Sequence, residues 1–286
     1  MVECVPNLSE GRDPQVLEEL RSSLCGVRVL DVCADRDHHR SVFTFAGNPE
    51  SVLAAAIRLA EATVDRLTIS THQGVHPRMG VLDVLPFIPV SGVSLADCAA
   101  LAHRAADILW QRFRLPSFFY EAAGNQPLEE VRRLARQGES PHTGVGRHAT
   151  AGAVAIGARD FLIAWNIWLD TNDLLLAKAM AKAIRASSGG LAGVKALGLP
   201  LPSRNLVQIS INSVNFEITP LHTVLDAVRA LAAQAQVTIR GSELIGLIPQ
   251  RAVDLSQGHD LLWLNWHDDM IFERRYSKES VSNPCP

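Results

Sequence analysis

The order of strand and helix signals repeats in the two halves of the chain, and this repeat limits the folds that the chain can adopt. Each half reads as strand, helix, strand, strand, helix, strand. The β-rich runs of the first half cover residues 2–8, 26–32, 40–47 and 81–90, and those of the second half cover 160–169, 193–199, 205–214 and 237–249. Residue identity between the halves is faint, so the repeat depends on element order and on how the helices begin.

The helices begin with the same local chemistry in both halves. Asp13-Pro14 and Asn48-Pro49 open the two helices of the first half, and Thr219-Pro220 opens the second helix of the other half. A side-chain oxygen at the N-cap accepts a hydrogen bond from the first turn, and proline at the first helical position has no amide hydrogen to leave unpaired. These pairs fix where the helices start.

Two strand-helix-strand units of this type predict an α+β protein made of two ferredoxin-like subdomains, with helices on the outer faces of the sheets. We place the first subdomain at residues 1–158 and the second at 159–286, and we expect the polar tail to fray from about residue 268. Two prolines in the run 81–90 predict that this strand ends early or lies at a sheet edge. The segment 140–159 is rich in Gly, Ser, Thr and His, and so long a loop in a compact chain is usually functional.

Composition excludes several classes of function. The formal net charge is −3, so the chain as a whole has no basic excess with which to attract nucleic acid. The first residues lack the basic stretch and apolar core of a signal peptide, and no apolar run has the length of a membrane span. We therefore expect a cytoplasmic protein, without membrane or nucleic-acid partners, and a homodimer as the commonest assembly.

Residues 71–80, THQGVHPRMG, carry the strongest chemical signal. His72 and His76 have the i, i+4 spacing of helical metal ligands, but Gly74 and Pro77 disfavour a helix and no acidic residue lies between the histidines, so we predict no metal site. Imidazole exchanges protons near neutral pH, and a histidine in a loop constrained by Gly and Pro can act as a positioned base. An ordinary turn histidine, bonded to a nearby carbonyl, is the alternative reading. Arg78 could bind a carboxylate through its planar donor fork.

Two further stretches are candidates with equally plain alternatives. In TGVGRHATAG, glycines allow backbone amides to approach a ligand closely, whereas a flexible linker is the alternative. In RDHHRS, residues 36–41, four basic or imidazole side chains occupy a turn, for which a solvated charged turn is the favoured interpretation.

The block HQGVHPRMGVLDVLPFIP, residues 72–89, resembles the signature of the glutamate formimidoyltransferase (formiminotransferase) family. Residues 1–11, 152–169 and 215–249 are also similar to that family, and the similarity covers nearly all of residues 1 to about 255. The resemblance implies two ferredoxin-like subdomains whose sheets face each other across a folate-binding tunnel. It covers the transferase alone, without the helical cyclodeaminase domain that some relatives carry.

The resemblance also implies a reaction. N-formimidoyl-L-glutamate gives its formimino group to N5 of tetrahydrofolate, yielding 5-formimidoyltetrahydrofolate and L-glutamate, a step of histidine degradation and one-carbon metabolism. Tetrahydrofolate is then a co-substrate, and no covalently bound cofactor is expected. The family's catalytic histidine maps onto His76. The residues expected to bind folate or the donor are Arg40, Arg78, Gly80 and the loop Thr143, Gly144, Val145, Gly146, Arg147, His148, Ala149, Thr150, Ala151 and Gly152.

The sequence departs from the family at a few positions, which leaves an alternative function open. Relatives carry an acidic residue where this chain has Cys33 and an asparagine where it has His39, and the folate loop shares little beyond its final glycine. A folate-binding or interaction protein that kept the scaffold, with lost or altered formimino transfer, is the alternative.

Overall fold

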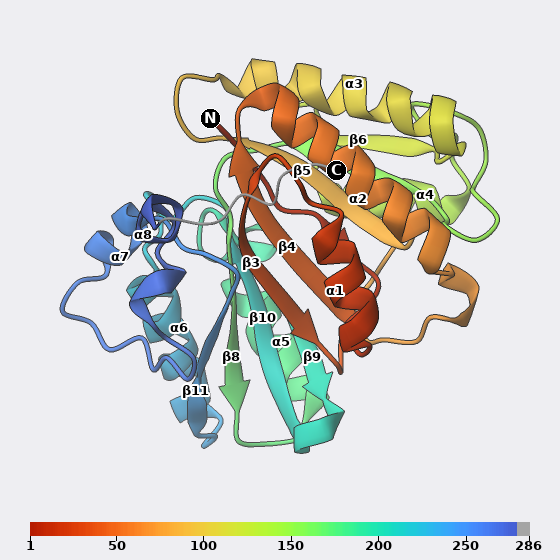
Figure 1. Cartoon of the computed structure of the whole chain (residues 1–286). Helices are drawn as coiled ribbons and strands as arrows, with labels where there is room; N and C mark the ends of the chain where they lie inside the picture. The colour runs from red at the N-terminus through yellow and green to blue at the C-terminus, as the bar shows by residue number, and fades with distance from the viewer. Residues whose placement is uncertain (279–286) are drawn as a thin grey trace. The chain divides into compact units, whose positions relative to one another are not determined.

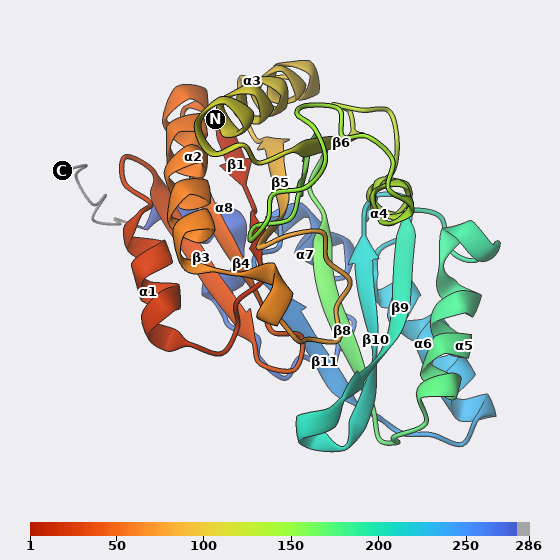
Figure 2. The ribbon, with the colours of Figure 1, turned by 90° about the vertical axis from the view of Figure 1, so that its right-hand side faces the viewer.

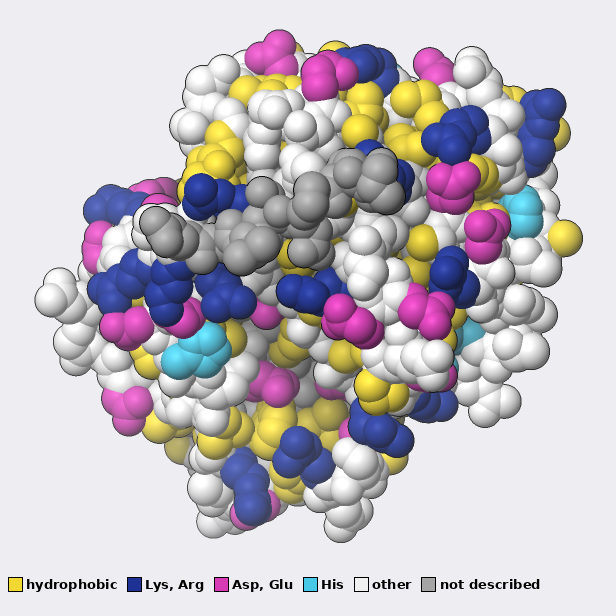
Figure 3. All heavy atoms as spheres, viewed as in Figure 1, with side chains coloured by type: hydrophobic (Ala, Val, Ile, Leu, Met, Phe, Trp, Pro, Cys, Tyr) yellow, Lys and Arg dark blue, Asp and Glu magenta, His cyan; other side chains and the backbone are white. Residues whose placement is uncertain are grey.

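A computed structural model describes residues 1–278 of the chain, and these residues form two compact units, Met1–Asp160 and Phe161–Lys278 (Figure 1). Each unit contains one β-sheet and its own apolar core, so the protein is a mixed α+β structure. On the face drawn in Figure 3, basic and acidic side chains are interspersed, in keeping with the near-neutral composition. Among the described residues, no helix combines the length and apolar character that a membrane crossing requires.

The first unit is built on a mixed sheet of seven strands. Its elements, in chain order, are β1 Val2–Cys4, β2 Asn7–Leu8, α1 Pro14–Ser22, β3 Arg28–Asp35, β4 Arg40–Gly47, α2 Pro49–Arg66, the short 3-10 turn η1 Ile69–Thr71, β5 Leu82–Pro89, α3 Leu95–Phe113, β6 Ser117–Glu121, α4 Leu128–Gln137 and β7 Val154–Ala158. β4 pairs with β3 on one side and with β1 and β2 on the other, and β5 follows, all antiparallel. β7 and β6 extend the sheet beyond β5 in parallel.

The two helix starts predicted for this unit are confirmed, whereas the start predicted at Thr219-Pro220 is wrong: that helix begins at Leu221 with Pro220 at its N-cap, and the Thr219 hydroxyl donates to the Ala192 carbonyl instead of capping it. The Asp13 carboxylate accepts hydrogen bonds from Gln15 and Val16 at the start of α1, and the Asn48 side chain accepts one from Ser51 at the start of α2. Helices α2 and α3 lie side by side over one face of the sheet (Figure 1), and their apolar residues form the main core with the strands beneath.

The structure corrects two expectations about this sheet. β5 is an interior strand rather than an edge, because β1 and β2 pair on one side of it and β7 on the other. Pro86 is tolerated there because the neighbouring strand is interrupted at that level, between Cys4 opposite Phe87 and Asn7 opposite Val84. Residues 154–158, expected to belong to a loop, form the fully buried strand β7.

Helix α4 lies on the opposite face of the sheet from α1, α2 and α3 (Figure 2), so the helices of this unit do not all lie on one face of its sheet. Its apolar residues Val131 and Ala135 are one turn apart and pack against Phe118, Tyr120 and Ala155. The small side chains that β7 presents on this face leave room for the helix. As a result α4 brings its charged residues close to the sheet face that the other helices leave open.

The second unit repeats the strand and helix order predicted from the sequence. Its elements are β8 Ile163–Leu169, α5 Leu174–Ile184, η2 Ala186–Ser188, β9 Val194–Leu201, η3 Pro202–Arg204, β10 Leu206–Ser213, α6 Leu221–Gln234, β11 Ile239–Ile245, α7 Gln250–Leu255, η4 Asp268–Met270 and α8 Phe272–Ser277. The sheet order is β11-β8-β10-β9, and every pair is antiparallel. Helices α5 and α6 lie together on one side of it (Figure 2).

The tail was expected to fray from about residue 268, but the structure is regular as far as residue 277. Residues 268–277 form η4 and α8, because Met270, Ile271 and Phe272 are buried in the core of the second unit and hold this segment in place. Ile248 also donates a backbone hydrogen bond to Met270 and accepts one from Phe272. The rest of the expected tail, residues 279–286, lies outside the described residues.

Candidate active site

The loop that carries the two histidines, residues 72–80, joins η1 to β5 and is not helical, as Gly74 and Pro77 predict. The i, i+4 spacing therefore does not bring His72 and His76 onto one face. The His72 ring stacks on His39, with ring centroids 4.2 Å apart, whereas His76 lies against other partners. Within residues 1–278, no group of three or more His, Cys, Asp or Glu side chains could hold a metal ion.

Arg78 holds this loop in shape. Its Nη2 donates to the carbonyl oxygens of Gly74 at 2.8 Å and of His76 at 2.6 Å, and its Nη1 contacts Nδ1 of His72. Gly74 is needed here, because an added Cβ would lie 2.2 Å from the carbonyl oxygen of His38. The guanidinium that was expected to bind a substrate carboxylate is thus directed in this structure toward its own loop.

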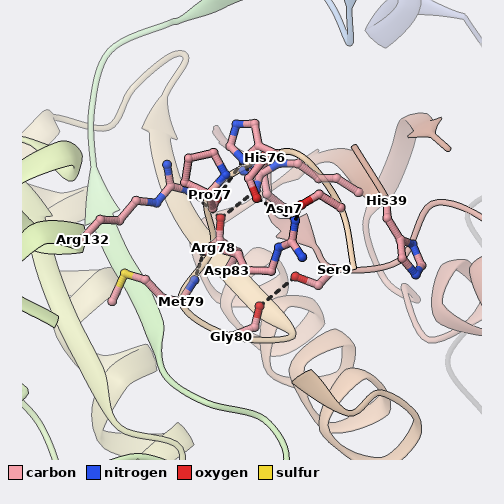
Figure 4. A network of polar contacts seen from close by, with 12 residues as sticks. Asn7, Ser9, His39, His76, Pro77, Arg78, Met79, Gly80, Asp83 and Arg132 are labelled. Atoms are coloured by element: carbon pink, nitrogen blue, oxygen red, sulfur yellow. Dashed lines mark hydrogen bonds and ion pairs between the residues drawn. The ribbon is translucent and has the colours of Figure 1, made fainter. Parts of the chain in front are cut away.

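Asp83 of β5 organises the charged groups beneath the loop (Figure 4). It is fully buried, and its Oδ1 accepts a hydrogen bond from the Met79 amide at 2.7 Å. Its Oδ2 accepts from Nη1 of Arg40 at 2.6 Å and from Nη2 of Arg132, which extends from α4. Burial alone would raise the pKa of this carboxyl, but Arg132 and Arg40 outweigh burial and lower the pKa to about 2.

A local irregularity of the sheet accompanies this placement of Asp83. The pairing of β2 with β5 shifts register between Asn7 opposite Val84 and Leu8 opposite Leu82, so Asp83 is an extra residue on β5. Such bulges redirect side chains and occur often beside active sites. Here the bulge is in the strand segment that follows the histidine loop directly.

Arg40, the first residue of β4, links three segments that are distant in sequence. Its Nε and Nη2 donate to Oδ1 of Asn7 at 3.1 and 2.7 Å, while its Nη1 contacts both Asp83 and, at 3.2 Å, Nδ1 of His76. Most of its donors therefore have protein acceptors. This arrangement fixes the guanidinium beside the imidazole of His76.

The surroundings of His76 define which ring nitrogen carries the proton. Nδ1 lies 2.8 Å from the carbonyl oxygen of Pro77, which can only accept, and 3.2 Å from Arg40, which can only donate. We assign the proton to Nδ1, because the carbonyl contact is shorter and the Arg40 nitrogen already donates to Asp83 at 2.6 Å. Nε2 then carries the lone pair of a neutral imidazole.

The same surroundings keep this imidazole neutral. Burial lowers the pKa of His76 well below its usual 6.5, and the positive charges of Arg40 and Arg132 lower it further, against smaller opposing effects of Asp83 and the Pro77 carbonyl. At neutral pH, Nε2 is therefore available to accept a proton. A rigid loop and an unprotonated ring nitrogen are the features that a general base requires.

The turn at residues 36–41 was interpreted as solvated, which is wrong for His38. This side chain is only 7% exposed, because the turn packs against the histidine loop, and its ring meets His76 edge-on with centroids 6.0 Å apart. His39 adopts a positive φ of 48°, and its Nδ1 accepts a hydrogen bond from the Gly11 amide at 3.2 Å. His38 therefore packs against the ring of His76, and His39 accepts from the backbone at Gly11.

The loop expected to bind folate divides into two parts in the structure. His148–Gly152 form a tight turn in which His148 and Gly152 exchange backbone hydrogen bonds of 2.7 and 3.0 Å. This turn lies against the histidine loop, since Val81 donates to the Ala151 carbonyl at 2.9 Å and an added Cβ on Gly80 would lie 2.4 Å from the same oxygen. The structure thus brings Gly80, Ala151 and Gly152 together.

The other part, Thr143–Arg147, lies elsewhere on the first unit. Thr143 pairs with Ser117 at the start of β6, and Gly144 fits closely against the ring of Trp110. The Arg147 guanidinium donates to the Ala135 carbonyl of α4 at 2.8 Å. These residues hold α3, β6 and α4 together, and the structure does not bring them to His76.

Asn7, Arg40, His76, Asp83 and Arg132 form one polar cluster. Three of its members were not singled out from the sequence: Asn7, Asp83 and Arg132. Asp83 had a signal, because it is the one acidic residue in the apolar run 81–90. Asn7 and Arg132 had none, since their roles depend on how β2 and α4 pack in three dimensions.

Two family models match most of the chain. Residues 1–159 match the model of the formiminotransferase domain, N-terminal subdomain, and residues 164–262 match that of the formiminotransferase domain. The chain is 35% identical to a glutamate formimidoyltransferase of Streptococcus pyogenes, over 88% of this chain and 90% of that one, and 36% identical to a protein of the same name from Thermoplasma acidophilum, over 97% and 98%. It is also 35% identical to mouse formimidoyltransferase-cyclodeaminase, over 88% of this chain and 51% of the longer mouse protein. The chain therefore belongs to the formiminotransferase family of transferases.

Proposed function

We propose that this protein transfers the formimino group of N-formimidoyl-L-glutamate to N5 of tetrahydrofolate, giving 5-formimidoyltetrahydrofolate and L-glutamate, as a step of histidine degradation. Two relatives that match over most of their length are named glutamate formimidoyltransferase, which supports formimino transfer. The acceptor and the pathway follow from the family resemblance. Tetrahydrofolate acts as a co-substrate in this proposal.

The observation that carries the proposal is the neutral ring of His76 and the hydrogen bond of its Nδ1 to the Pro77 carbonyl. As N5 attacks the formimino carbon it loses a proton, and as the glutamate nitrogen departs it gains one. A neutral imidazole whose Nδ1 is bonded to the Pro77 carbonyl offers Nε2 to accept the first proton and can return it to the leaving nitrogen. A positioned base of this kind contributes about 10²–10⁴ in rate.

The remaining site residues receive distinct roles. Arg40 fixes and tunes His76, and Arg78 keeps the loop in shape through two carbonyl contacts. We assign folate contacts to Gly80 and to the turn His148–Gly152, because this turn is bonded directly to the segment that follows His76. The contacts of Thr143–Arg147 with their own unit favour a supporting role for that part of the loop.

We extend the proposal to the fold. Strand order β11-β8-β10-β9, fully antiparallel, with α5 and α6 on one side, supports a ferredoxin-like second subdomain, and β3-β4-β1-β5 gives the corresponding order in the first. We take the subdomains as residues 1–158 and 159–286. The face of the first sheet that α4 covers in part and the helix-free face of the second sheet are the surfaces that we assign to the substrate tunnel expected from the family.

Turnover with the two substrates tests the proposal. Purified protein, formimidoylglutamate and tetrahydrofolate should yield glutamate and 5-formimidoyltetrahydrofolate in equal amounts, measured by mass spectrometry. His76→Gln should lower kcat by about 10²–10⁴. The matched control is His103→Gln on α3, an exposed histidine whose ring contacts the Ala123 carbonyl and Phe119, and it should leave kcat unchanged.

If the protein only binds folate, no turnover is expected. This alternative rests on Cys33 and His39, where relatives carry other residues, and it requires folate to bind without any glutamate release. Folded protein that binds tetrahydrofolate but shows no turnover would replace the transferase proposal with this one.

A further inference from the structure

Arg132 is a charged residue of the cluster to which the proposed chemistry assigns no role. It reaches Asp83 from α4, the helix on the otherwise open sheet face, and lies beside Pro77 and Asp83 in Figure 4. Its Nε is buried and has no hydrogen-bond partner among the described residues, and the loop 72–80 contains no acidic residue. A buried donor without an acceptor is costly, and such groups often mark a ligand site.

The charges around His76 do not balance. Arg40 and Arg132 carry two positive charges, and both use the same oxygen of one carboxylate, Asp83. Their side chains are only 13% and 14% exposed, so water compensates the excess charge poorly. With His76 neutral, the cluster has a positive excess that an anionic substrate group would neutralise.

Arg132 has more unused donors than the other arginines near His76. Arg40 donates to Asn7 and Asp83 through all three of its nitrogens, and Arg78 donates to its own loop. Arg132 makes its hydrogen bond through Nη2 alone, to Asp83. A guanidinium with remaining donors suits a carboxylate, which accepts two parallel hydrogen bonds.

We propose that Arg132 binds the α-carboxylate of the formimino donor and thereby selects an amino-acid donor; this inference rests on the proposed function. In formimidoylglutamate the α-carboxylate carbon is three bonds from the formimino carbon, so a donor positioned for reaction at His76 brings that carboxylate close to the reacting centre. The carboxylates of folate lie at the far end of that molecule from N5. A cation adjacent to His76 therefore matches the donor rather than the acceptor.

Kinetics of Arg132→Gln and Arg132→Lys test the inference, with Arg133→Gln as the matched control. Arg133 is the next residue on α4, exposed and paired with Glu130. We expect KM for formimidoylglutamate to rise about 10- to 100-fold in Arg132→Gln, as for loss of a hydrogen bond to a charged group, with KM for tetrahydrofolate changed less than about twofold. Arg132→Lys keeps the charge without the planar fork and should fall between Arg132→Gln and the unmodified protein.

A donor analogue isolates the carboxylate. The α-amide of formimidoylglutamate should be a poor substrate for the unmodified protein, by a similar factor, and Arg132→Gln should no longer distinguish amide from acid. If Arg132→Gln and Arg133→Gln have the same donor KM, Arg132 does not bind the carboxylate. The same conclusion follows if Arg132→Gln and the unmodified protein discriminate equally between the amide and the acid.

Product binding separates this inference from the proposed function. Calorimetric titration with L-glutamate requires no turnover, and affinity should fall about 10- to 100-fold in Arg132→Gln but not in Arg133→Gln. Should Arg132→Gln fail to fold, judged by circular dichroism, Arg132→Lys carries both measurements. Absence of turnover in the unmodified protein refutes the transferase, whereas unchanged glutamate affinity in a folded Arg132 variant refutes the inference.

Discussion

Asp83→Asn is expected to destabilise the first unit strongly, because this carboxylate is the shared counter-ion of two buried arginines. The substitution keeps the shape and the acceptor for the Met79 amide but removes the charge that Arg40 and Arg132 contact. The pKa of Asp83 falls from 3.8 to about 2, which corresponds to about 2.5 kcal/mol of stability at neutral pH. Removing one partner of a buried ion pair typically costs about 3–5 kcal/mol, so we expect a loss of about 3 kcal/mol.

The pH dependence of this loss has a definite sign. A carboxyl whose pKa is lowered on folding contributes stability that is complete above its unfolded pKa and disappears as pH falls through the folded value. The difference between the unmodified protein and Asp83→Asn should therefore be constant above about pH 4 and narrow between about pH 4 and pH 2. Urea unfolding followed by circular dichroism at several pH values measures it.

Glu50→Gln is the matched control. Glu50 meets Arg104 at 2.7 and 2.8 Å, distances like those at Asp83, but both side chains are more than half exposed. Exposed pairs contribute little, so we expect only a small effect at neutral pH. If Asp83→Asn destabilises the protein no more than Glu50→Gln, burial does not determine how much the Asp83 ion pairs stabilise the fold. The reasoning about the cluster is then wrong.

Three further predictions concern the histidine loop. Gly74→Ala should lower kcat at least tenfold with little change in melting temperature of the second unit, because the new Cβ would lie 2.2 Å from the His38 carbonyl and displace the loop; normal kcat would show that the loop can shift freely. Arg78→Lys should lower kcat while leaving KM for both substrates within about twofold, since lysine lacks the second nitrogen with which Arg78 contacts Nδ1 of His72 while it donates to the loop carbonyls; a selective rise in donor KM would instead identify Arg78 as a carboxylate ligand. The acid limb of kcat/KM should lie below pH 6.5, because the base must be unprotonated and the pKa of His76 is lowered; a limb above pH 7 would contradict the assignment.

Local sequence signals predicted most of the elements, because they depend on neighbouring residues. The Asn48-Pro49 pair marks the start of α2, and the β-rich runs of the second half predicted the strands of the second unit. What the sequence did not predict depends on contacts between distant segments. The prolines of 81–90 suggested an edge, and only the interruption between β1 and β2 explains how Pro86 fits an interior strand.

The candidate site divides in the same way. His76 was a candidate base because Gly74 and Pro77 constrain its loop, and the family resemblance then favoured it over an ordinary turn histidine. Arg132 was not, because its part in the site requires α4 to pack on the face opposite to α2, and that choice depends on the small residues of β7. The sequence of a charged helix does not show which face of a sheet the helix covers until the strand beneath it is known.

The cluster also predicts a difference between the free and donor-bound protein. A base with a low pKa is unprotonated at neutral pH but weak, and proton transfer is most efficient when the pKa is near the working pH. In the free protein, burial, Arg40 and Arg132 lower the pKa of His76, opposed by Asp83, while the neighbouring His38 is itself kept neutral mainly by burial. A donor carboxylate bound to Arg132 would add a negative charge and raise the pKa of His76 toward neutrality. Since kcat/KM reports the free enzyme and kcat the bound complex, the acid limb of kcat should lie at higher pH than that of kcat/KM, and this separation should shrink in Arg132→Gln. Coincident limbs in the unmodified protein would show that the donor carboxylate binds away from the imidazole.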